Sequence, residues 1–164
     1  MKPISLTAVV LTALLQAVNA DFNLYRVGIG GDGITGNSEG WQVYQDNAGC
    51  DNELDWIWRE SDDVSGGQYG VRCEGDGCER GSDSNPSDID LVEMNFDSDE
   101  HHWTFYKDRD GSLHDLSDNR VGRCLPSSNE EFSCGLSTGR VEGVRKLRCE
   151  IEGVSANDIN VRPD

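Results

Sequence analysis

Three histidines are the side chains in this sequence best suited to catalysis near neutral pH. His101 and His102 are adjacent, and His114 follows a short distance along the chain. Histidine gives and takes protons at physiological pH, and together with a carboxylate and an arginine it can cleave RNA by acid–base catalysis. One hypothesis is therefore a secreted hydrolase of ribonuclease type, in which His101 or His102 acts with a nearby Glu and Arg.

The elements around these histidines argue against all three acting together. Strand-like residues on both sides of Asp110-Gly111 predict a hairpin with a tight two-residue turn, because glycine tolerates positive φ. That register places His114 opposite Lys107 and about 17 Å from His102. A shared three-histidine site, whether catalytic or metal-binding, would need a different register or a curled sheet.

Other catalytic and metal-binding patterns are weak. The sequence has no Gly-x-Ser-x-Gly elbow for a serine nucleophile. Residues 108–112 resemble part of a calcium loop, but aligning the glycine puts Tyr106 at the first ligand position and Ser117 where a glutamate is needed. Clustered acids at 62–63 and 97–100 could still bind Ca²⁺, although turn formation and solvation are their simpler role. We expect no metal or cofactor and assign no catalytic residue.

The tryptophans allow either a packed core or a binding surface for sugar rings. If residues 56–58 form a strand, Trp56 and Trp58 share one face, as a stacking platform would require. Tryptophans bury large apolar areas and usually pack inside. We therefore expect Trp41, Trp56, Trp58 and Trp103 in the core, and keep a carbohydrate-binding module as an alternative.

Residues 1–20 have the pattern of a cleavable secretory signal. Lys2 precedes an uncharged apolar stretch, which closes with small residues before Asp21. The stretch is interrupted by polar residues and is shorter than the roughly 20 apolar residues that span a bilayer. We predict a secreted, extracellular protein with a single domain over residues 21–164.

The cysteines support export. An even number of cysteines in an exported chain indicates disulfides rather than free thiols or zinc. The six are Cys50, Cys73, Cys78, Cys124, Cys134 and Cys149. Six cysteines allow 15 pairings, among which the sequence does not choose. One hypothesis joins Cys73 to Cys78 and Cys124 to Cys134 across short polar loops, and Cys50 to Cys149.

The chain is strongly acidic, with 14 Lys and Arg against 31 Asp and Glu and a formal net charge of −17. Such a surface repels phosphate backbones and anionic lipids, so we expect neither nucleic-acid nor membrane binding. Solubility explains this charge, and attraction of a cationic partner is the functional alternative. We expect a monomer whose partners are extracellular proteins or glycans. Arginine is the commoner basic residue, and it pairs well with carboxylates.

Alternating apolar and polar residues predict strands rather than helices. Phe22 and Leu24 alternate with Tyr25, and near the C-terminus Leu147 should point inward and Lys146 outward. About eight short strands, joined by loops rich in Gly, Asp, Ser and Asn, predict a mainly β domain. The expected fold is a disulfide-bonded antiparallel β-sandwich or distorted barrel with long polar loops.

Two segments, Gly70–Cys78 and His102–Arg109, resemble fungal small secreted cysteine-rich proteins when taken with the export signal and the cysteines. That group includes effector candidates of plant-associated fungi. The resemblance implies an extracellular protein that acts on a host or a competing microbe, and it assigns no catalytic residue. The acidic balance differs from the basic character of membrane-active antifungal proteins, which disfavours a lytic role. We predict a non-enzymatic, effector-like extracellular interaction protein, with the hydrolase and the carbohydrate-binding module as alternatives.

Overall fold

The computed structural model describes residues 19–30, 38–51, 57–81, 83–97, 100–127, 130–137 and 139–160. Residues 1–18 of the predicted signal lie outside this part, and Asn19 and Ala20 form the start of the first strand. Trp56 and residues 98–99 of the acidic loop also lie outside it. Within the described ranges, no helix is long and apolar enough to cross a membrane.

Strands dominate the described fold, because β-branched and aromatic residues alternate along them and Gly, Asp, Ser and Asn fill the turns. In chain order the elements are β1 (Asn19–Gly30), β2 (Ser38–Tyr44), β3 (Trp58–Arg59), β4 (Gly70–Glu74), η1 (Asp76–Cys78), η2 (Pro86–Asp88), β5 (Leu91–Asp97), β6 (His101–Tyr106), η3 (Lys107–Arg109), β7 (Ser112–His114), β8 (Arg120–Pro126), β9 (Glu131–Leu136), β10 (Gly139–Glu152) and α1 (Ala156–Ile159), where η marks 3₁₀ turns.

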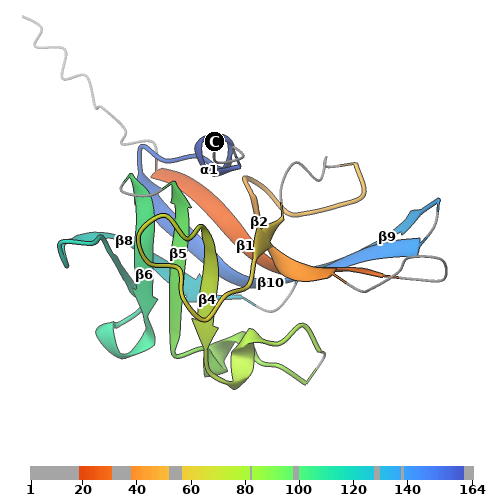
Figure 1. Ribbon diagram of the computed structural model, residues 1–164, viewed down its shortest axis with the longest axis horizontal. Coiled ribbons are helices and arrows are strands. Elements are labelled where there is room, and N and C mark those ends of the chain that lie inside the picture. Colours follow the sequence, from red (N-terminus) through yellow and green to blue (C-terminus); the bar gives the residue numbers. More distant parts are fainter. Residues whose placement is uncertain are drawn as a thin grey trace, which may run out of the picture.

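The strands form one sheet that curls into a nearly closed barrel (Figure 1). The strand order is β3-β2-β1-β10-β8-β7-β6-β5-β4, and β9 pairs with β10 beside this path. The two ends of the sheet meet where Glu60 and Val71 form a parallel bridge and Ser61 N donates to Val71 O at 3.2 Å. The predicted mainly β fold is confirmed, and the barrel is the form it takes.

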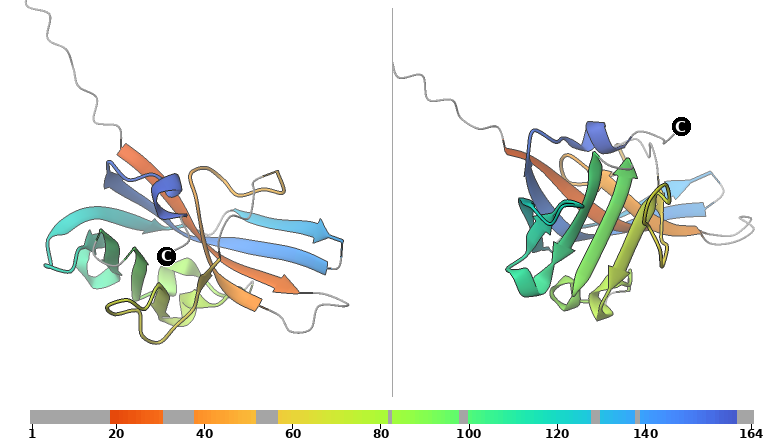
Figure 2. Two further views of the ribbon diagram at one scale, coloured as in Figure 1. Left: turned by 45° about the horizontal axis from the view of Figure 1, so that its top comes forward. Right: turned by 60° about the vertical axis from the view of Figure 1, so that its left-hand side comes forward.

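β10 changes partner along its length, and this change shapes the molecule. Its C-terminal part pairs with β8 and its N-terminal part with β9. Lys146 is an extra residue between the two parts, because Leu24 pairs with Leu147 while Tyr25 pairs with Arg145. A bulge of this kind bends a strand. The hairpin of β9 and residues 139–144, which we call the wing, projects from the barrel (Figures 1 and 2).

Aromatic side chains fill the barrel. Trp41, Trp58 and Trp103 are 0%, 1% and 4% exposed. Phe96 lies between two of them, with its ring centroid 5.0 Å from that of Trp58 and 6.3 Å from that of Trp103. The core placement is confirmed for these three tryptophans. A sugar-binding platform built on them is wrong, because their rings are buried.

A second, smaller cluster lies on the opposite face of β1. Tyr25, Val27 and Tyr44 are buried there, and Phe132 of the wing packs against them. The ring centroid of Tyr25 is 5.1 Å from that of Tyr44 and 5.9 Å from that of Phe132. Apolar side chains on the two faces of β1 therefore belong to two different cores, and Phe132 in the second core packs the wing against the barrel.

All six cysteines are in disulfides. Cys73–Cys78 forms as predicted. The other two predicted pairs are wrong, since the bonds join Cys50 to Cys134 and Cys124 to Cys149. Cys124 and Cys149 face each other directly on β8 and β10, and Cys134 lies in the wing. Strand register, which the spacing of cysteines does not reveal, decides the Cys124–Cys149 pair, while Cys50 reaches Cys134 from the turn that follows β2.

The hairpin between β6 and β7 has a different register from the predicted one. The 3₁₀ turn η3 precedes Asp110, whose φ is 58°, so the loop is longer than a two-residue turn. His114 consequently faces Thr104 rather than Lys107. In this register His102 and His114 are diagonal neighbours on paired strands. Such neighbours lie about 7–8 Å apart, so the larger predicted distance between these two histidines is wrong.

Candidate functional site

The outer wall of β4, β5 and β6 brings a histidine, a glutamate and an arginine into contact. His102 Nε2 lies 3.0 Å from Glu93 Oε1, and Arg72 Nη2 lies 2.9 Å from Glu93 Oε2. Strand register causes this contact, because Arg72 faces Glu93 directly while His102 is its diagonal neighbour. These are the residue types that the ribonuclease hypothesis requires around His102.

The same three side chains are shielded from solvent. The exposed fractions are 3% for His102, 18% for Glu93 and 27% for Arg72. Both oxygens of Glu93 already have a partner, and Arg72 also pairs with Glu74. A general base must come within hydrogen-bond distance of the proton that it removes. The arrangement therefore serves best as a charge-neutralised contact within the barrel wall.

His114 belongs to a separate polar group at β7. Its Nε2 lies 2.9 Å from Ser112 Oγ and its Nδ1 lies 3.1 Å from Asp118 Oδ1. The order of serine, histidine and aspartate resembles a catalytic triad. Ser112 is only 4% exposed, however, and its Oγ donates to Arg109 O at 2.8 Å. The Arg109 guanidinium also holds the pKa of the Asp118 carboxyl below its usual value. Sequence reasoning missed this group, because no serine motif marks it.

His101 is in a third environment. It is 9% exposed, and its ring packs edge-on against Trp103 with centroids 5.5 Å apart. Adjacent residues of a strand point to opposite faces, so His101 does not join His102. The structure therefore brings His102, but not all three histidines, together with a glutamate and an arginine.

Six of the twelve Lys and Arg residues in the described ranges form ion pairs with carboxylates of the fold. Arg26 is 3% exposed, and its Nη2 lies 3.1 Å from Glu39 and 2.5 Å from Glu60. Glu39 also contacts Arg80, which pairs with Glu142 at 2.9 Å. The other pairs are Arg72 with Glu74 and Glu93, Lys107 with Asp90, Arg109 with Asp118, and Arg140 with Glu142. The acidic composition therefore absorbs much of the positive charge internally.

Lys146 is fully buried, with 0% exposure, and forms no ion pair among the described residues. Its Nζ donates to Ser84 Oγ at 3.0 Å and to Ser84 O at 3.3 Å. Burial lowers the pKa of this amine and the positive charge of Arg26 acts in the same direction, while the negative charges of Glu79 and Glu131 act in the opposite direction and only partly offset them. The predicted outward orientation of Lys146 is wrong, because it is the extra residue of the β10 bulge.

Ser84 belongs to an acidic cap, residues 74–90, at one end of the barrel (Figure 1); residue 82 lies outside the described part. The Cys73–Cys78 disulfide closes the start of the cap. Gly75 has a φ of 111°, and a Cβ there would lie 2.3 Å from Asp88 O. Only glycine fits this close backbone approach. The cap is thus fixed by a covalent bond, a tight turn and Lys146.

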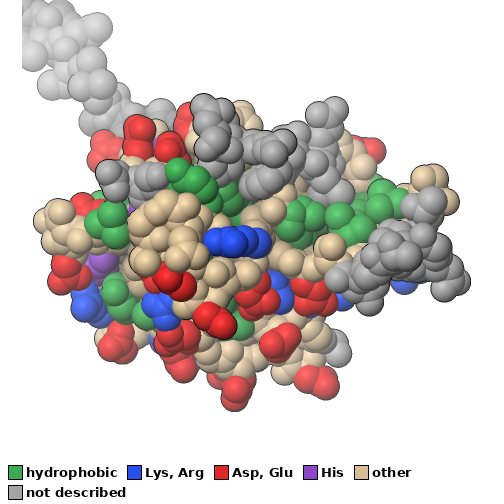
Figure 3. Space-filling model, viewed as in Figure 1, with side chains coloured by type: hydrophobic (Ala, Val, Ile, Leu, Met, Phe, Trp, Pro, Cys, Tyr) green, Lys and Arg blue, Asp and Glu red, His purple; other side chains and the backbone are tan. Residues whose placement is uncertain are grey.

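The cap presents negative charge to solvent. Four of its carboxylates are exposed and form no ion pair among the described residues, namely Asp76, Glu79, Asp83 and Asp88. Figure 3 shows acidic side chains along the lower edge of the molecule, where the cap lies. None of the four forms a described ion pair, although the negative charge of Glu79 partly offsets the effect of burial on the pKa of the Lys146 amine.

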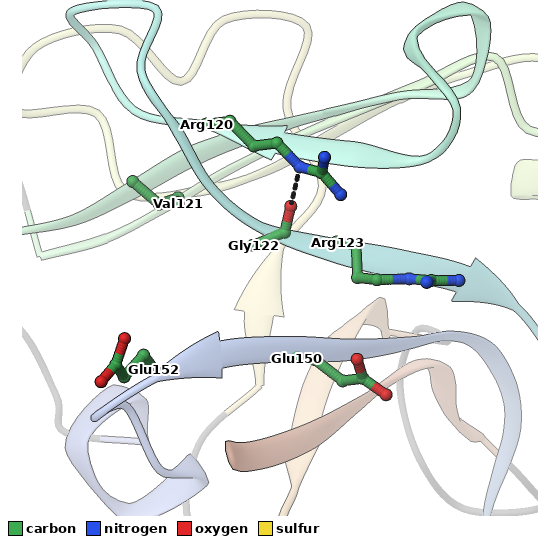
Figure 4. A pocket seen from close by; sticks show the side chains of 6 residues that line it. All are labelled: Arg120, Val121, Gly122, Arg123, Glu150 and Glu152. Carbon is green, nitrogen blue, oxygen red and sulfur yellow. Dashed lines mark hydrogen bonds between the residues drawn. The ribbon is translucent and has the colours of Figure 1, made fainter. Parts of the chain in front are cut away.

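A shallow hollow of about 330 Å³ lies between β8 and β10 (Figure 4). Arg120 and Arg123 line it from β8, and Glu150 and Glu152 line it from β10. Arg120 Nε donates to Gly122 O at 3.4 Å. The two signs of charge balance there, so the hollow favours no single class of charged ligand.

Metal binding finds no support in the described ranges, where no three His, Cys, Asp or Glu side chains are placed to hold an ion. Asp63, one of the clustered acids at 62–63, accepts hydrogen bonds from Ser65 Oγ at 2.7 Å and Gln68 Nε2 at 3.0 Å. It therefore serves the turn in which it lies.

Comparisons with known proteins do not identify a relative. The chain matches no protein family, and no curated protein or solved structure is significantly similar to it. What the structure establishes is a disulfide-rich β-barrel, which is consistent with an extracellular protein. Its function has to be inferred from its own geometry and charge.

Proposed function

We propose that this protein is a non-enzymatic, effector-like extracellular interaction protein that binds a positively charged partner through the acidic cap. One observation supports this above the others: half of the described basic side chains are ion-paired with carboxylates of the fold, while four carboxylates of the cap are exposed and form no described ion pair. Unpaired surface charge steers partners of opposite sign and selects among them. The fixed backbone of the cap reduces the ordering that binding would otherwise require.

The test compares two variants of the full chain that have the same net charge. In the cap variant, Asp76, Glu79, Asp83 and Asp88 are replaced by the corresponding amides. In the control variant, four exposed acids elsewhere, Asp46, Asp62, Glu100 and Glu152, are replaced in the same way. The probe is a fluorescently labelled oligolysine, whose affinity is measured by anisotropy at low salt.

We expect the cap variant to bind the oligolysine at least about tenfold more weakly than the wild type, and the control variant to change far less, because nearby charges dominate at short range. Equal weakening of both variants would mean that net charge alone attracts the probe. That result, or no binding by the wild type, would contradict the proposal.

A hydrolase of ribonuclease type is the second candidate, favoured by the contact of His102 with Glu93 and of Glu93 with Arg72. The net charge of −17 opposes it, since RNA is a polyanion. Incubation with RNA at mildly acidic pH tests it, with H102A as the variant and circular dichroism as the check on folding. Cleavage by the wild type that disappears in folded H102A would replace the first proposal.

A further inference from the structure

We infer that Arg80 of the acidic cap occupies a binding site for a guanidinium group, and that an arginine of the cationic partner binds there in its place. This inference rests on the proposed function, and it specifies which basic side chain the partner presents and which contact of the fold that side chain replaces.

The site lies across three neighbouring strands. Gly28 of β1 faces Glu142 of β10 on one side and Glu39 of β2 on the other. Residues directly opposite each other on paired strands direct their side chains to the same face of the sheet. The two carboxylates therefore stand on either side of a backbone position that has no side chain.

The Arg80 guanidinium fills the gap between the two carboxylates. Its Nη1 donates to Glu142 Oε2 at 2.9 Å, and its Nη2 donates to Glu39 Oε1 at 3.3 Å. A Cβ on Gly28 would lie 2.7 Å from Arg80 Nε and 2.9 Å from Arg80 Cζ. The glycine thus makes room for the guanidinium, because any larger residue would displace it.

Other contacts hold both carboxylates in place. Glu39 uses its second oxygen to accept a hydrogen bond from Arg26 at 3.1 Å, and Glu142 uses its second oxygen to accept one from Arg140 at 3.2 Å. Groups that are already oriented lose little freedom when they bind a ligand. The site therefore keeps its two acceptors in position when Arg80 leaves it.

Arg80 is held weakly enough to be replaced. Its side chain is 29% exposed, and the side chains of Glu39 and Glu142 are 39% and 35% exposed. Ion pairs with this exposure contribute little to stability, because solvent screens them and the side chains lose freedom. Arg80 Nε is buried without a hydrogen-bond partner among the described residues, which adds a further cost. Another guanidinium can therefore compete for the same carboxylates.

A hollow of about 380 Å³ between the cap and the wing leads to this site. Arg80 and Glu142 line the hollow together with Glu131. Glu131 is exposed and forms no ion pair among the described residues. The hollow thus offers an entering arginine a carboxylate that Arg80 does not use.

The geometry favours arginine over lysine. The two acceptors belong to different strands, and Arg80 reaches them with two different nitrogens of one planar group. A guanidinium presents several N–H groups in fixed directions, whereas a lysine ammonium is a single compact charge. One arginine of the partner can bridge both carboxylates, as Arg80 does.

The experiment measures the binding of two labelled peptides of equal length and charge, oligoarginine and oligolysine, to variants of the full chain. R80A empties the site. R140A is its matched control, because it has the same net charge and also removes one partner of Glu142. R80A/G28A has that charge too, but it places a methyl group in the gap. Fluorescence anisotropy at low salt gives the affinities, and circular dichroism checks folding.

R80A should bind oligoarginine about threefold or more tightly than the wild type does, because the peptide no longer competes with an internal arginine. Its affinity for oligolysine should rise no more than that of R140A. R80A/G28A should lose the gain for oligoarginine. R80K, which leaves the net charge unchanged, should show part of that gain, so the inference is testable even if R80A does not fold.

Two results would overturn the inference and leave the proposed function standing. Equal gains for the two peptides, or equal gains in R80A and R140A, would show that net charge alone acts. A gain for oligoarginine that persists in R80A/G28A would mean that the peptide binds elsewhere. Failure of the proposed function looks different, because the wild type and every variant would then bind neither peptide.

Discussion

Lys146 places an amine inside the barrel with Ser84 of the cap as its hydrogen-bond partner. A buried charge without a carboxylate partner is costly, and a group in such a site lowers that cost by giving up its proton more readily. The amine therefore positions the cap loop through its hydrogen bonds to Ser84 rather than adding to the free energy of unfolding. It holds the loop that carries the unpaired carboxylates against the end of the barrel.

The pH dependence of stability tests the burial of Lys146. Its pKa is lower in the folded protein than in the unfolded chain. Between the two values the unfolded chain binds more protons, so the free energy of unfolding should rise with pH up to the ordinary lysine pKa of about 10.4. K146M removes this titration. Tyr25, whose pKa burial raises, titrates in both proteins and cancels in the difference.

Urea unfolding of the wild type and K146M from about pH 7 to about pH 10.4 gives the measurement. The free energy of unfolding of the wild type should increase relative to that of K146M across this range. Parallel curves would show that the amine is solvated in the folded state.

The wing depends on one contact between elements. Gly143 of β10 lies under Phe132 of β9, and a Cβ at Gly143 would lie 2.3 Å from Phe132 Cε1. The ring cannot move freely, because it also packs against Tyr25 and Tyr44. The close approach of backbone and ring thus fixes the position of β9 on β10.

G143A should destabilise the protein by about 1–3 kcal/mol, as overpacking of a filled core does. G135A is the matched control in the same hairpin, because nothing lies within 4 Å of a Cβ at Gly135. Thermal unfolding of both variants measures the effect. A melting temperature of G143A equal to that of G135A would contradict the packing of Phe132.

Individual elements show where sequence reasoning succeeds and where it does not. Alternation is a local property, so it correctly placed Phe22 and Leu24 opposite Tyr25. Register is not local, because the 3₁₀ turn before Asp110 and the bulge at Lys146 each shift the strands. These shifts moved His114 and turned Lys146 inward. The contacts of Glu93 with His102 on one side and Arg72 on the other need three strands in register, and the sequence could only suggest the residue types.

At the scale of the whole molecule, the three disulfides differ in the number of residues between the two cysteines that they join. Cys50–Cys134 joins residues 84 apart, Cys124–Cys149 residues 25 apart and Cys73–Cys78 residues 5 apart. Cross-links stabilise mainly by restricting the unfolded chain, and the restriction grows with loop length. Cys50–Cys134 connects the wing to the loop that follows β2, and Cys124–Cys149 connects β8 to β10. Cys73–Cys78 closes the start of the cap.

Replacing each cystine by two serines should therefore reduce stability in the order of loop length. The expected losses are about 4–5 kcal/mol for Cys50–Cys134, about 3–4 kcal/mol for Cys124–Cys149 and about 2 kcal/mol for Cys73–Cys78. Urea unfolding of the three variants gives the order, and peptide mapping without reductant checks the pairing. The largest loss at Cys73–Cys78 would contradict this account.

Half of the described basic side chains are ion-paired within the fold, while four exposed carboxylates of the cap remain available to a cationic partner. Salt separates this claim from apolar attraction, since exposed charges are screened over about 10 Å at 0.1 M and about 3 Å at 1 M salt. The affinity of the wild type for oligolysine, measured over that range, should fall at least about tenfold, and that of the cap variant should fall much less. An affinity of the wild type that does not change with salt would contradict the account.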